Sequence, residues 1–509
     1  MLSSGGLHWI DLTVIAAYAS GMMGLGWYYS RRQESTEEYF VGSRAMNPLL
    51  IGISLFATLL STITYLASPG EMIKHGPTML WGVLSVPIAY VVAGYCIIPA
   101  LMRHRLTSAY ELLEKKLGLS ARLLGALMFI TLRLLWMTVL LNFAATALLG
   151  MLGLGKEWLL PVSAVIGAVA LVYSSMGGLR AVVITDFLQF VLLLGGGILV
   201  ILMITWRTGG LAWFPTQWES TWDKQPIFSW DPHVRLTIVG VVVMQSLWAV
   251  CTFGSDQTAI QRYMATADAR AARRSFLIKS LAGVVVSAVL ALVGFSLLYY
   301  FREFPERLPA GQTIATAADG LFPRFISHEF PIGVSGLVVS GMFAAAMSSL
   351  DSGVNSISAV VLTDFVDRSR SAPLGRQMHV RVARLIAVVV GITVIIASLL
   401  LEYVPGNFLE VSKRVTGLLV TPLFALFFMA LFVPFATSLG TIIGALCGFA
   451  TTIVIAYWQP LFSDRPLSIT LINPCGITVS LTMAMLLSWM TYRPPAPQVP
   501  EKTSAIKSE

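Results

Sequence analysis

The sequence has too few charged residues to coat a water-soluble globule. Only 12% of its 509 residues are Asp, Glu, Lys or Arg, whereas 56% are apolar. The apolar residues form runs of roughly 18 to 28 between short charged loops, the length that a helix needs to cross about 30 Å of hydrocarbon. Alternating ten-residue strands are missing, which excludes a membrane β-barrel. The sequence therefore predicts an all-α, multi-pass membrane protein.

Cysteine and histidine are also scarce, and their positions exclude several kinds of site. The four cysteines lack disulfide or metal-ligand spacing. The six histidines fall in loops or at predicted span ends, which leaves no intramembrane metal cluster or nucleophile with a base, so we expect no enzymatic activity. A channel is disfavoured because the polar groups cluster at mid-depth. The formal net charge is +8, and the basic residues lie in loops beside the apolar runs. This placement indicates the topology of a membrane protein and not nucleic-acid binding.

Counting the apolar runs predicts about thirteen transmembrane helices. Nothing cationic precedes the first run, which is expected to be a retained span and not a cleaved signal. The expected spans are 8–29, 47–68, 78–102, 121–152, 157–176, 180–206, 234–255, 273–302, 332–366, 380–403, 407–433, 436–459 and 473–492.

Charge in the loops predicts the orientation in the cytoplasmic membrane. An external N-terminus puts about twice as many Lys and Arg residues, Arg262 and Lys279 among them, in cytoplasmic loops as outside. An odd number of helices then places the C-terminus in the cytoplasm. Two longer loops, 207–232 and 303–331, are expected outside. The Pro-rich, charged tail at 493–509 is expected to be disordered.

Polar residues within apolar runs are the first candidates for function, because hydrocarbon penalises them. Five Ser and Thr residues interrupt the span between residues 54 and 71. Their hydroxyls can bond to main-chain carbonyls and loosen the helix, and a break would free carbonyls to ligate a hard cation. Small polar residues of this kind also let helices pack closely, so the pattern alone leaves both interpretations open.

A second segment carries a stripe of hydroxyls on one helix face. Ala345, Ser348, Ser349 and Ser352 have the spacing i, i+3, i+4 and i+7, with Asp351 beside them. Oxygen ligands of this kind suit a small hard cation such as sodium. A packing seam would explain the serines but not Asp351, because a carboxylate at mid-depth costs roughly 2.5–3.5 kcal/mol on insertion scales. The stripe therefore predicts a cation site.

Two further charged residues lie inside predicted spans. Asp186 follows a Gly-Gly turn, and it could pair with Arg180 or face Ser352 and Asp351 across the bundle. Arg133 has apolar neighbours on both sides. It could hold the carboxylate of an anionic substrate by two parallel hydrogen bonds, or it could pair with an acid of the protein.

Three motifs, in this order, resemble the sodium:solute symporter family: YSSMGGLRAVVITDFLQ, SDQTAIQRYMA and SSLDSGVNSISAVVLTDF. The resemblance covers about residues 8–460. It implies a LeuT-like fold with two inverted repeats of five helices, one extra helix before them and two after. The first helix of each repeat is expected to be broken, near 57–61 and 249–253.

The resemblance also implies domain boundaries and a monomer in lipid. The expected segments are 1–46 for the first helix and its loop, 47–206 for the first repeat, 207–232 for an external loop, 233–433 for the second repeat, 434–492 for the two last helices and 493–509 for the tail.

The sodium site implied by the family consists of the carbonyls of Ala57, Leu60 and Ala345 with the hydroxyls of Ser348 and Ser349. Some relatives hold a second sodium ion, for which the matching positions here are Asp186, Ser348, Asp351 and Ser352. Those relatives usually carry Ser or Thr where this chain has Asp351. Two carboxylates around one site would hold sodium more strongly or trap a proton.

The solute is expected beside the first helix break. The implied contacts are Ser61, Thr64, Trp81, Ser85, Arg133, Trp136, Thr252 and Phe253. The sugar branch of the family carries Gln, Glu and Asn at positions where this chain has Thr64, Val83 and Ala249, which argues against a hexose. The sialic-acid branch has a carboxylate-binding Arg about one turn from Arg133.

These features predict sodium-coupled symport of a small organic solute by alternating access. We expect an organic anion, such as a monocarboxylate or an acidic sugar. A neutral sugar, polyol or amino acid, proton coupling at Asp186 and Asp351, and a sensor that binds without transport remain as alternatives. Sodium is the one ion expected to bind.

Overall fold

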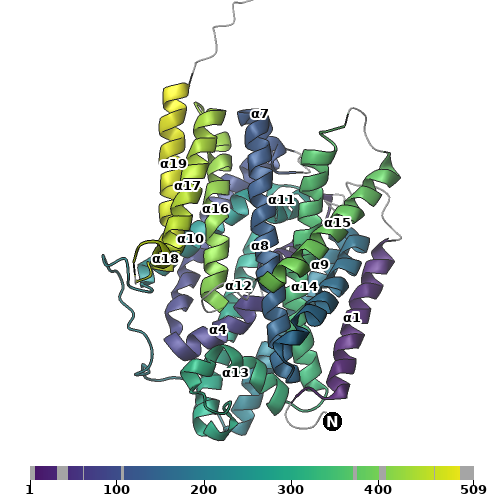
Figure 1. The fold of residues 1–509 in the computed structure, drawn as a ribbon, viewed down its shortest axis with the longest axis vertical. Coiled ribbons are helices and arrows are strands. Elements are labelled where there is room, and N and C mark those ends of the chain that lie inside the picture. The colour runs from purple at the N-terminus through teal and green to yellow at the C-terminus, as the bar shows by residue number, and fades with distance from the viewer. Residues whose placement is uncertain are drawn as a thin grey trace, which may run out of the picture.

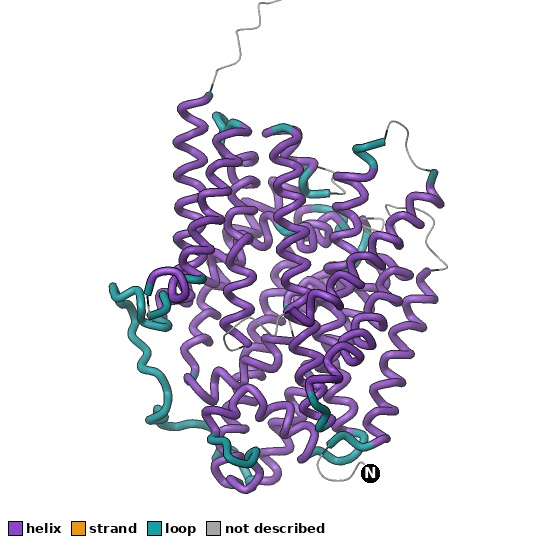
Figure 2. Tube along the Cα trace, in the orientation of Figure 1, coloured by secondary structure: helices purple, strands orange, loops and turns teal. Residues whose placement is uncertain are grey.

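The computed structural model describes residues 6–30, 44–60, 62–104, 108–370, 375–400, 408–463 and 465–492. Those ranges contain helices and no strands (Figure 2). Eleven helices are long and apolar enough to cross a membrane, or twelve when the bent pair α3 and α4 is counted as one span. The predicted all-α membrane fold is confirmed. The predicted tail at 493–509 and Ser61 lie outside the described residues.

The helix bounds follow the expected spans closely. The main helices are α1 (Trp9–Ser30), α3 (Pro48–Leu59), α4 (Thr62–His75), η2 (Pro77–Leu84) continuing through α5 (Ser85–Val91), η3 (Val92–Ile97) and α6 (Ile98–Met102), α7 (Glu111–Leu117), α8 (Leu119–Leu152), α9 (Leu159–Arg207), α10 (Ile238–Ser255), α11 (Gln257–Met264), α12 (Ala269–Glu303), α13 (Ile314–Glu329), α14 (Val334–Val360) continuing as η6 (Val361–Val366), α15 (Arg376–Ser398), α16 (Phe408–Phe432), α17 (Ser438–Ala456), α18 (Trp458–Phe462) and α19 (Ile472–Thr491).

One feature agrees with the predicted spans, and one departs from them. The expected pair of spans at 157–176 and 180–206 is present as two helices that meet at a kink at Gly178, and α9 comprises both. Gly178 has φ 58° and ψ −170°, a conformation that is essentially restricted to glycine. The predicted external loop 303–331 contains helix α13, which hydropathy misses because its 16 residues are short and partly polar. Thr313 caps α13 by accepting a hydrogen bond from the backbone N–H of Thr316.

The bundle has two ends that serve as landmarks. In Figure 1, α13 lies at the bottom, where α1 begins, and α7 lies at the top, where α19 ends. We call these the α13 end and the α7 end. The long loop between α9 and α10 runs along the outside of the bundle (Figure 2). Helix α14 is the central element, since residues 338–360 are buried throughout.

Two helices are interrupted inside the bundle. The first break separates α3 from α4, whose axes differ by 62°, and Leu60 has an extended backbone with ψ 113°. The second break separates α10 from α11 at Asp256, with ψ 122°. It was predicted near 249–253 and lies a few residues later, because Asp256 acts as the N-cap of a new helix and its Oδ1 accepts from the Thr258 N–H at 2.8 Å.

Candidate functional site

The first helix break packs directly against the hydroxyl stripe of α14. Ser348 Oγ lies 2.9 Å from the carbonyl oxygen of Ala57 and 3.2 Å from that of Ala345. The α3 helix ends just after Ala57, so the carbonyls of its last turn lack the helical partners that a continuing helix would provide. The serine hydroxyl of one helix thus meets the freed carbonyls of the other.

Ser349 completes the same contact one residue further along α14. Its Oγ lies 2.8 Å from the Thr58 carbonyl oxygen and 3.4 Å from the Leu60 carbonyl oxygen. Ser348 and Ser349 are each 1% exposed. The five residues predicted to hold sodium therefore converge where the broken helix touches α14. Neutral carbonyl and hydroxyl oxygens form a donor set that fits a hard monovalent cation.

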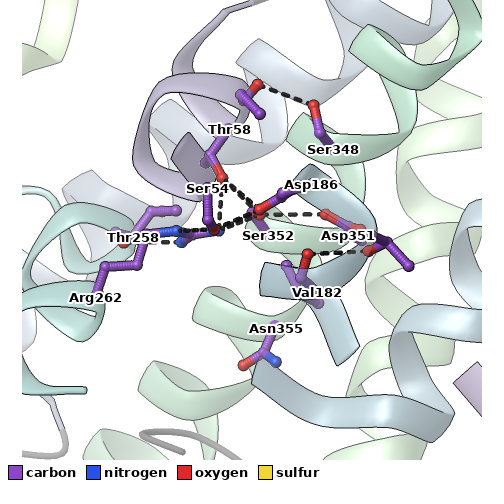
Figure 3. A network of polar contacts seen from close by, with 12 residues as sticks. Ser54, Thr58, Val182, Asp186, Thr258, Arg262, Ser348, Asp351, Ser352 and Asn355 are labelled. Atoms are coloured by element: carbon purple, nitrogen blue, oxygen red, sulfur yellow. Dashed lines mark hydrogen bonds and ion pairs between the residues drawn. The ribbon is translucent and has the colours of Figure 1, made fainter. Parts of the chain in front are cut away.

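A second polar cluster lies one turn along α14 toward the α7 end, and an arginine occupies its centre (Figure 3). The guanidinium of Arg262 donates hydrogen bonds to Thr58 Oγ1 at 2.5 Å, to Ser352 Oγ at 2.6 Å and to Ser54 Oγ at 2.9 Å. It also lies 3.3 Å from Asp186 Oδ2. Every one of these side chains is at most 1% exposed.

The two predicted carboxylates both belong to this cluster. Asp186 accepts a 2.5 Å hydrogen bond from Ser54 through Oδ2, while its Oδ1 has no hydrogen-bond partner among the described residues. Asp351 accepts a hydrogen bond from Ser352 Oγ at 3.1 Å. The cluster thus combines two buried carboxyl groups with one buried guanidinium.

The sequence interpretation of Arg262 was wrong, since it assigned this residue to a cytoplasmic loop. Helix α11 contains few apolar residues, so hydropathy places it outside the membrane, but every one of its residues is buried by neighbouring helices. Asp186 accordingly pairs with Arg262 across the bundle. The motif QRY drew attention to this region, but its arginine had no visible partner in the sequence.

Arg133 forms an ion pair with an acid of the protein. Its Nη2 lies 2.5 Å from Asp256 Oδ2 at the second helix break, and the two residues are 4% and 2% exposed. Of the two interpretations left open by the sequence, this geometry favours the structural pair. The neighbouring Trp136 packs in a cluster with Ala67 and Val411.

A cavity of about 230 Å³ opens beside the first break, between α4, η2, α5, α10, α12 and α16. Two of the predicted substrate residues, Thr64 and Ser85, line it. Trp81 is 43% exposed and donates a hydrogen bond to Gln225. The remaining lining residues are Ser68, Glu71, Met72, Met79, Leu80, Gly82, Val83, Val86, Ala89, Gln245, Trp248, Ala249, Phe276, Lys279, Ser280, Gly283, Val284, Ser287, Ala291 and Lys413.

Arg133, Trp136, Thr252 and Phe253 are not among the residues that line this cavity in the described part of the chain. Each is buried, with at most 8% exposure. Phe253 lies next to the cavity, because the ammonium of Lys279 sits 4.4 Å from the centre of its ring. Phe253 therefore helps to position Lys279, which lines the cavity.

The charged groups of the cavity were not predicted. Lys279 had been assigned to a cytoplasmic loop, but the structure places it on the cavity wall, and Lys413 joins it from α16. The Lys413 ammonium lies 5.7 Å from the ring centre of Trp248. The single acid on the wall, Glu71, already binds Arg235 at 2.8 Å. The cavity wall thus has an excess of positive charge.

Known proteins resemble this chain in sequence and in fold. The model of the Sodium:solute symporter family matches residues 39–448. The sodium/sialic acid symporter SiaT of Proteus mirabilis is 28% identical over 468 residues, which cover 89% of this chain and 90% of that protein. The sodium-coupled monocarboxylate transporter 1 of Xenopus laevis is 27% identical over 457 residues, which cover 87% and 71%.

Solved structures agree with these relatives. The outward-open, substrate-bound structure of a Na⁺-coupled sialic acid symporter, for which a novel Na⁺ site is described, superposes with a TM-score of 0.81 at 26% identity, covering 94% of this chain and 98% of that one. The nucleobase-cation-symport-1 transporter Mhp1, at 12% identity and a TM-score of 0.59, shares the fold alone. This chain belongs to the sodium:solute symporter family, has its LeuT-like fold, and is a sodium-coupled symporter of a small solute.

Proposed function

We propose that this protein uses the sodium gradient to take up a small organic anion, such as a monocarboxylate or an acidic sugar. The observation that carries the proposal is the charge of the cavity beside the first helix break. Lys279 and Lys413 line it, and neither ammonium has an ion-pair partner among the described residues. A partly buried cation without a partner is costly unless a ligand neutralises it, and an anionic solute would do so.

The relatives support the same class of solute. The matched proteins include symporters for sialic acid and for monocarboxylates, both of which are organic acids. At three positions of the wall where the sugar branch carries Gln, Glu or Asn, this chain has Thr64, Val83 and Ala249. A neutral sugar, polyol or amino acid would bring no net negative charge to the two lysines, which have no ion-pair partner among the described residues.

The proposed sodium site uses the carbonyls of Ala57, Leu60 and Ala345 with the hydroxyls of Ser348 and Ser349. Sodium bound there would tie the broken helix to α14 in the conformation that completes the cavity. Each net charge that crosses a potential of 100 mV contributes about 2.3 kcal/mol, which is roughly fiftyfold in accumulation. One sodium ion carried with a monovalent anion moves no net charge, so the sodium concentration gradient alone drives that uptake, and a second sodium ion would add the contribution of the potential.

Orientation, repeats and assembly complete the proposal. The loop charges support an N-terminus outside and a C-terminus in the cytoplasm, so that the α13 end faces outward. The inverted repeats are assigned to 47–206 and 233–433, and the protein is proposed to act as a monomer in the lipid of the cytoplasmic membrane.

Uptake into proteoliposomes tests this function. Radiolabelled sialic acid, lactate, pyruvate, glucose and proline would be offered at a fixed membrane potential, with sodium present or replaced by choline. We expect sodium-dependent uptake of at least one acid and little uptake of glucose or proline. Full activity in choline would refute sodium coupling. Sodium-driven uptake confined to glucose or proline would refute the proposal that the solute is an organic anion.

One observation favours a second candidate, in which a proton also takes part. Asp186 and Asp351 bring two buried carboxyl groups into one cluster. Two carboxylates near one another favour the binding of a proton or of a second sodium ion. Uptake driven by a pH gradient in sodium-free medium distinguishes this candidate from coupling to sodium alone.

A further inference from the structure

The two lysines of the cavity lie at different depths along α12 and the broken helix. Helix α12 runs beside α3 and α4 in the same direction, since Gly52 closely approaches Ile278, Gly283 lies near Phe56, and Gly294 contacts Met72. Lys279 is therefore level with α3, on the α7 side of the break. On α16, Val411 and Val415 pack with Ala67 of α4, so Lys413 lies on the α13 side.

The cavity is longer than a small solute. Its wall on α12 extends from Phe276 to Ala291, which is about 22 Å at 1.5 Å per residue. A small organic acid has one carboxylate and is much shorter than this wall. Because Lys279 and Lys413 lie on opposite sides of the break, a carboxylate that moves along the cavity meets them at different points of its path.

Each lysine sits in similar surroundings. Lys279 lies over the ring of Phe253, with Phe276 next to it at 5.8 Å, and Lys413 lies over the ring of Trp248. An aromatic face favours an ammonium group but leaves its hydrogen-bond donors available for a ligand. In the described part of the chain, neither ammonium has a hydrogen bond to another side chain.

We propose that Lys413 and Lys279 bind the anionic group of the solute in succession, one on each side of the helix break. This inference rests on the proposed function and assigns two positions to the solute path. Lys413 receives the anion when the cavity is open to the α13 end, and Lys279 holds it when the cavity is open to the α7 end. The sodium ligands lie between the two depths, at the break itself.

Transport measured from each side of the membrane tests the two positions. Right-side-out and inside-out vesicles would be prepared from cells that express the wild type, Lys413→Gln or Lys279→Gln. The initial rate of sodium-driven entry would be followed for radiolabelled sialic acid, lactate and pyruvate. Loss of a charged hydrogen bond raises a half-saturating concentration about tenfold or more. Lys413→Gln is expected to do so from the α13 end alone, and Lys279→Gln from the α7 end alone.

Controls separate charge from folding. Lys413→Arg and Lys279→Arg keep the charge and should restore much of the affinity on the affected side. Lys116→Gln removes a charge from the exposed surface of α7 and should change neither side. The unfolding temperature of each purified variant shows whether it folds.

The outcomes distinguish the inference from the function on which it rests. If the wild type takes up none of the acids, the proposed function fails and the two positions fail with it. If the wild type takes up an acid but each Gln variant alters both sides equally, or neither side, only the two-position inference is overturned. A Gln variant that does not fold is replaced by the Met variant of the same lysine, which also removes the charge, and whose unchanged affinity on both sides would likewise overturn the inference.

Discussion

Removal of the hydroxyls of Ser348 and Ser349 is expected to weaken sodium binding steeply. Both serines contact the carbonyls freed at the end of α3, at 2.9 and 2.8 Å. An interaction between a polar group and a charged one contributes about 1.5–3 kcal/mol, so each Ser→Ala change should raise the dissociation constant for sodium about ten- to hundredfold. The protein should still fold, because alanine keeps the helix and fits the space.

Thermal unfolding of the purified protein measures this effect without knowledge of the solute. Sodium would be titrated against choline at constant ionic strength. At a sodium concentration 100 times the wild-type dissociation constant, the wild type gains about 2.7 kcal/mol of stability. A hundredfold weaker variant gains only about 0.4 kcal/mol at the same concentration, from the same relation.

Ser340→Ala is the matched control for this experiment. Ser340 is as deeply buried on the same helix, but its hydroxyl donates to the carbonyl of Gly336 one turn earlier, at 2.8 Å. Its removal should leave the sodium titration unchanged. Stabilisation by sodium that is the same in the wild type and in Ser348→Ala/Ser349→Ala would show that the cation binds elsewhere.

Three further predictions concern the two buried ion pairs and the kink in α9. Arg262→Gln should lower the free energy of unfolding by about 3–5 kcal/mol, because it leaves buried carboxylates without their cation, and addition of Asp186→Asn should recover part of this in denaturation measurements. Arg133→Gln and Asp256→Asn should each destabilise the protein more than the double variant does; equal sensitivity of all three would contradict the pair. Gly178→Ala should cost about 1–3 kcal/mol, since φ 58° with ψ −170° strains any residue with a Cβ, and an unchanged unfolding temperature would contradict that strain.

Patterns repeated along one helix could be predicted from the sequence. Apolar runs locate the spans because the hydrocarbon acts on every residue of a run. The hydroxyl stripe at Ser348 and Ser349 could also be predicted, since its spacing is that of one helix face. Its contact with Ala57 and Leu60 required the family resemblance, because nothing in the local sequence shows which helix packs against the stripe.

Single buried charges could not be predicted in the same way. Arg262 lies in a polar stretch after the end of a span, which hydropathy assigns to a loop, and Lys279 lies near the start of the next span, where it was counted with the loop charges. What holds Arg262 inside is its pairing with Asp186, which is 76 residues away in the chain. A lone charged residue carries no periodic signal, and its environment depends on helices that come together only in the folded bundle. For the same reason, the sequence could not show that Arg133 pairs with Asp256, which lies at the break between α10 and α11.

Sodium and solute are expected to strengthen each other's binding, because both depend on one helix break. The carbonyls of Ala57 and Leu60, proposed to bind sodium, lie at the end of α3, and Thr64 lies on the cavity wall about one turn further along the chain. Sodium that fixes the break therefore fixes Thr64 as well. Coupling between two ligands is reciprocal, so the factor by which saturating sodium lowers the dissociation constant of the solute must equal the factor by which saturating solute lowers that of sodium. Equilibrium binding of the transported acid at two sodium concentrations, with the reverse titration, measures both factors, and a solute affinity that is independent of sodium would show that the break does not link the two sites.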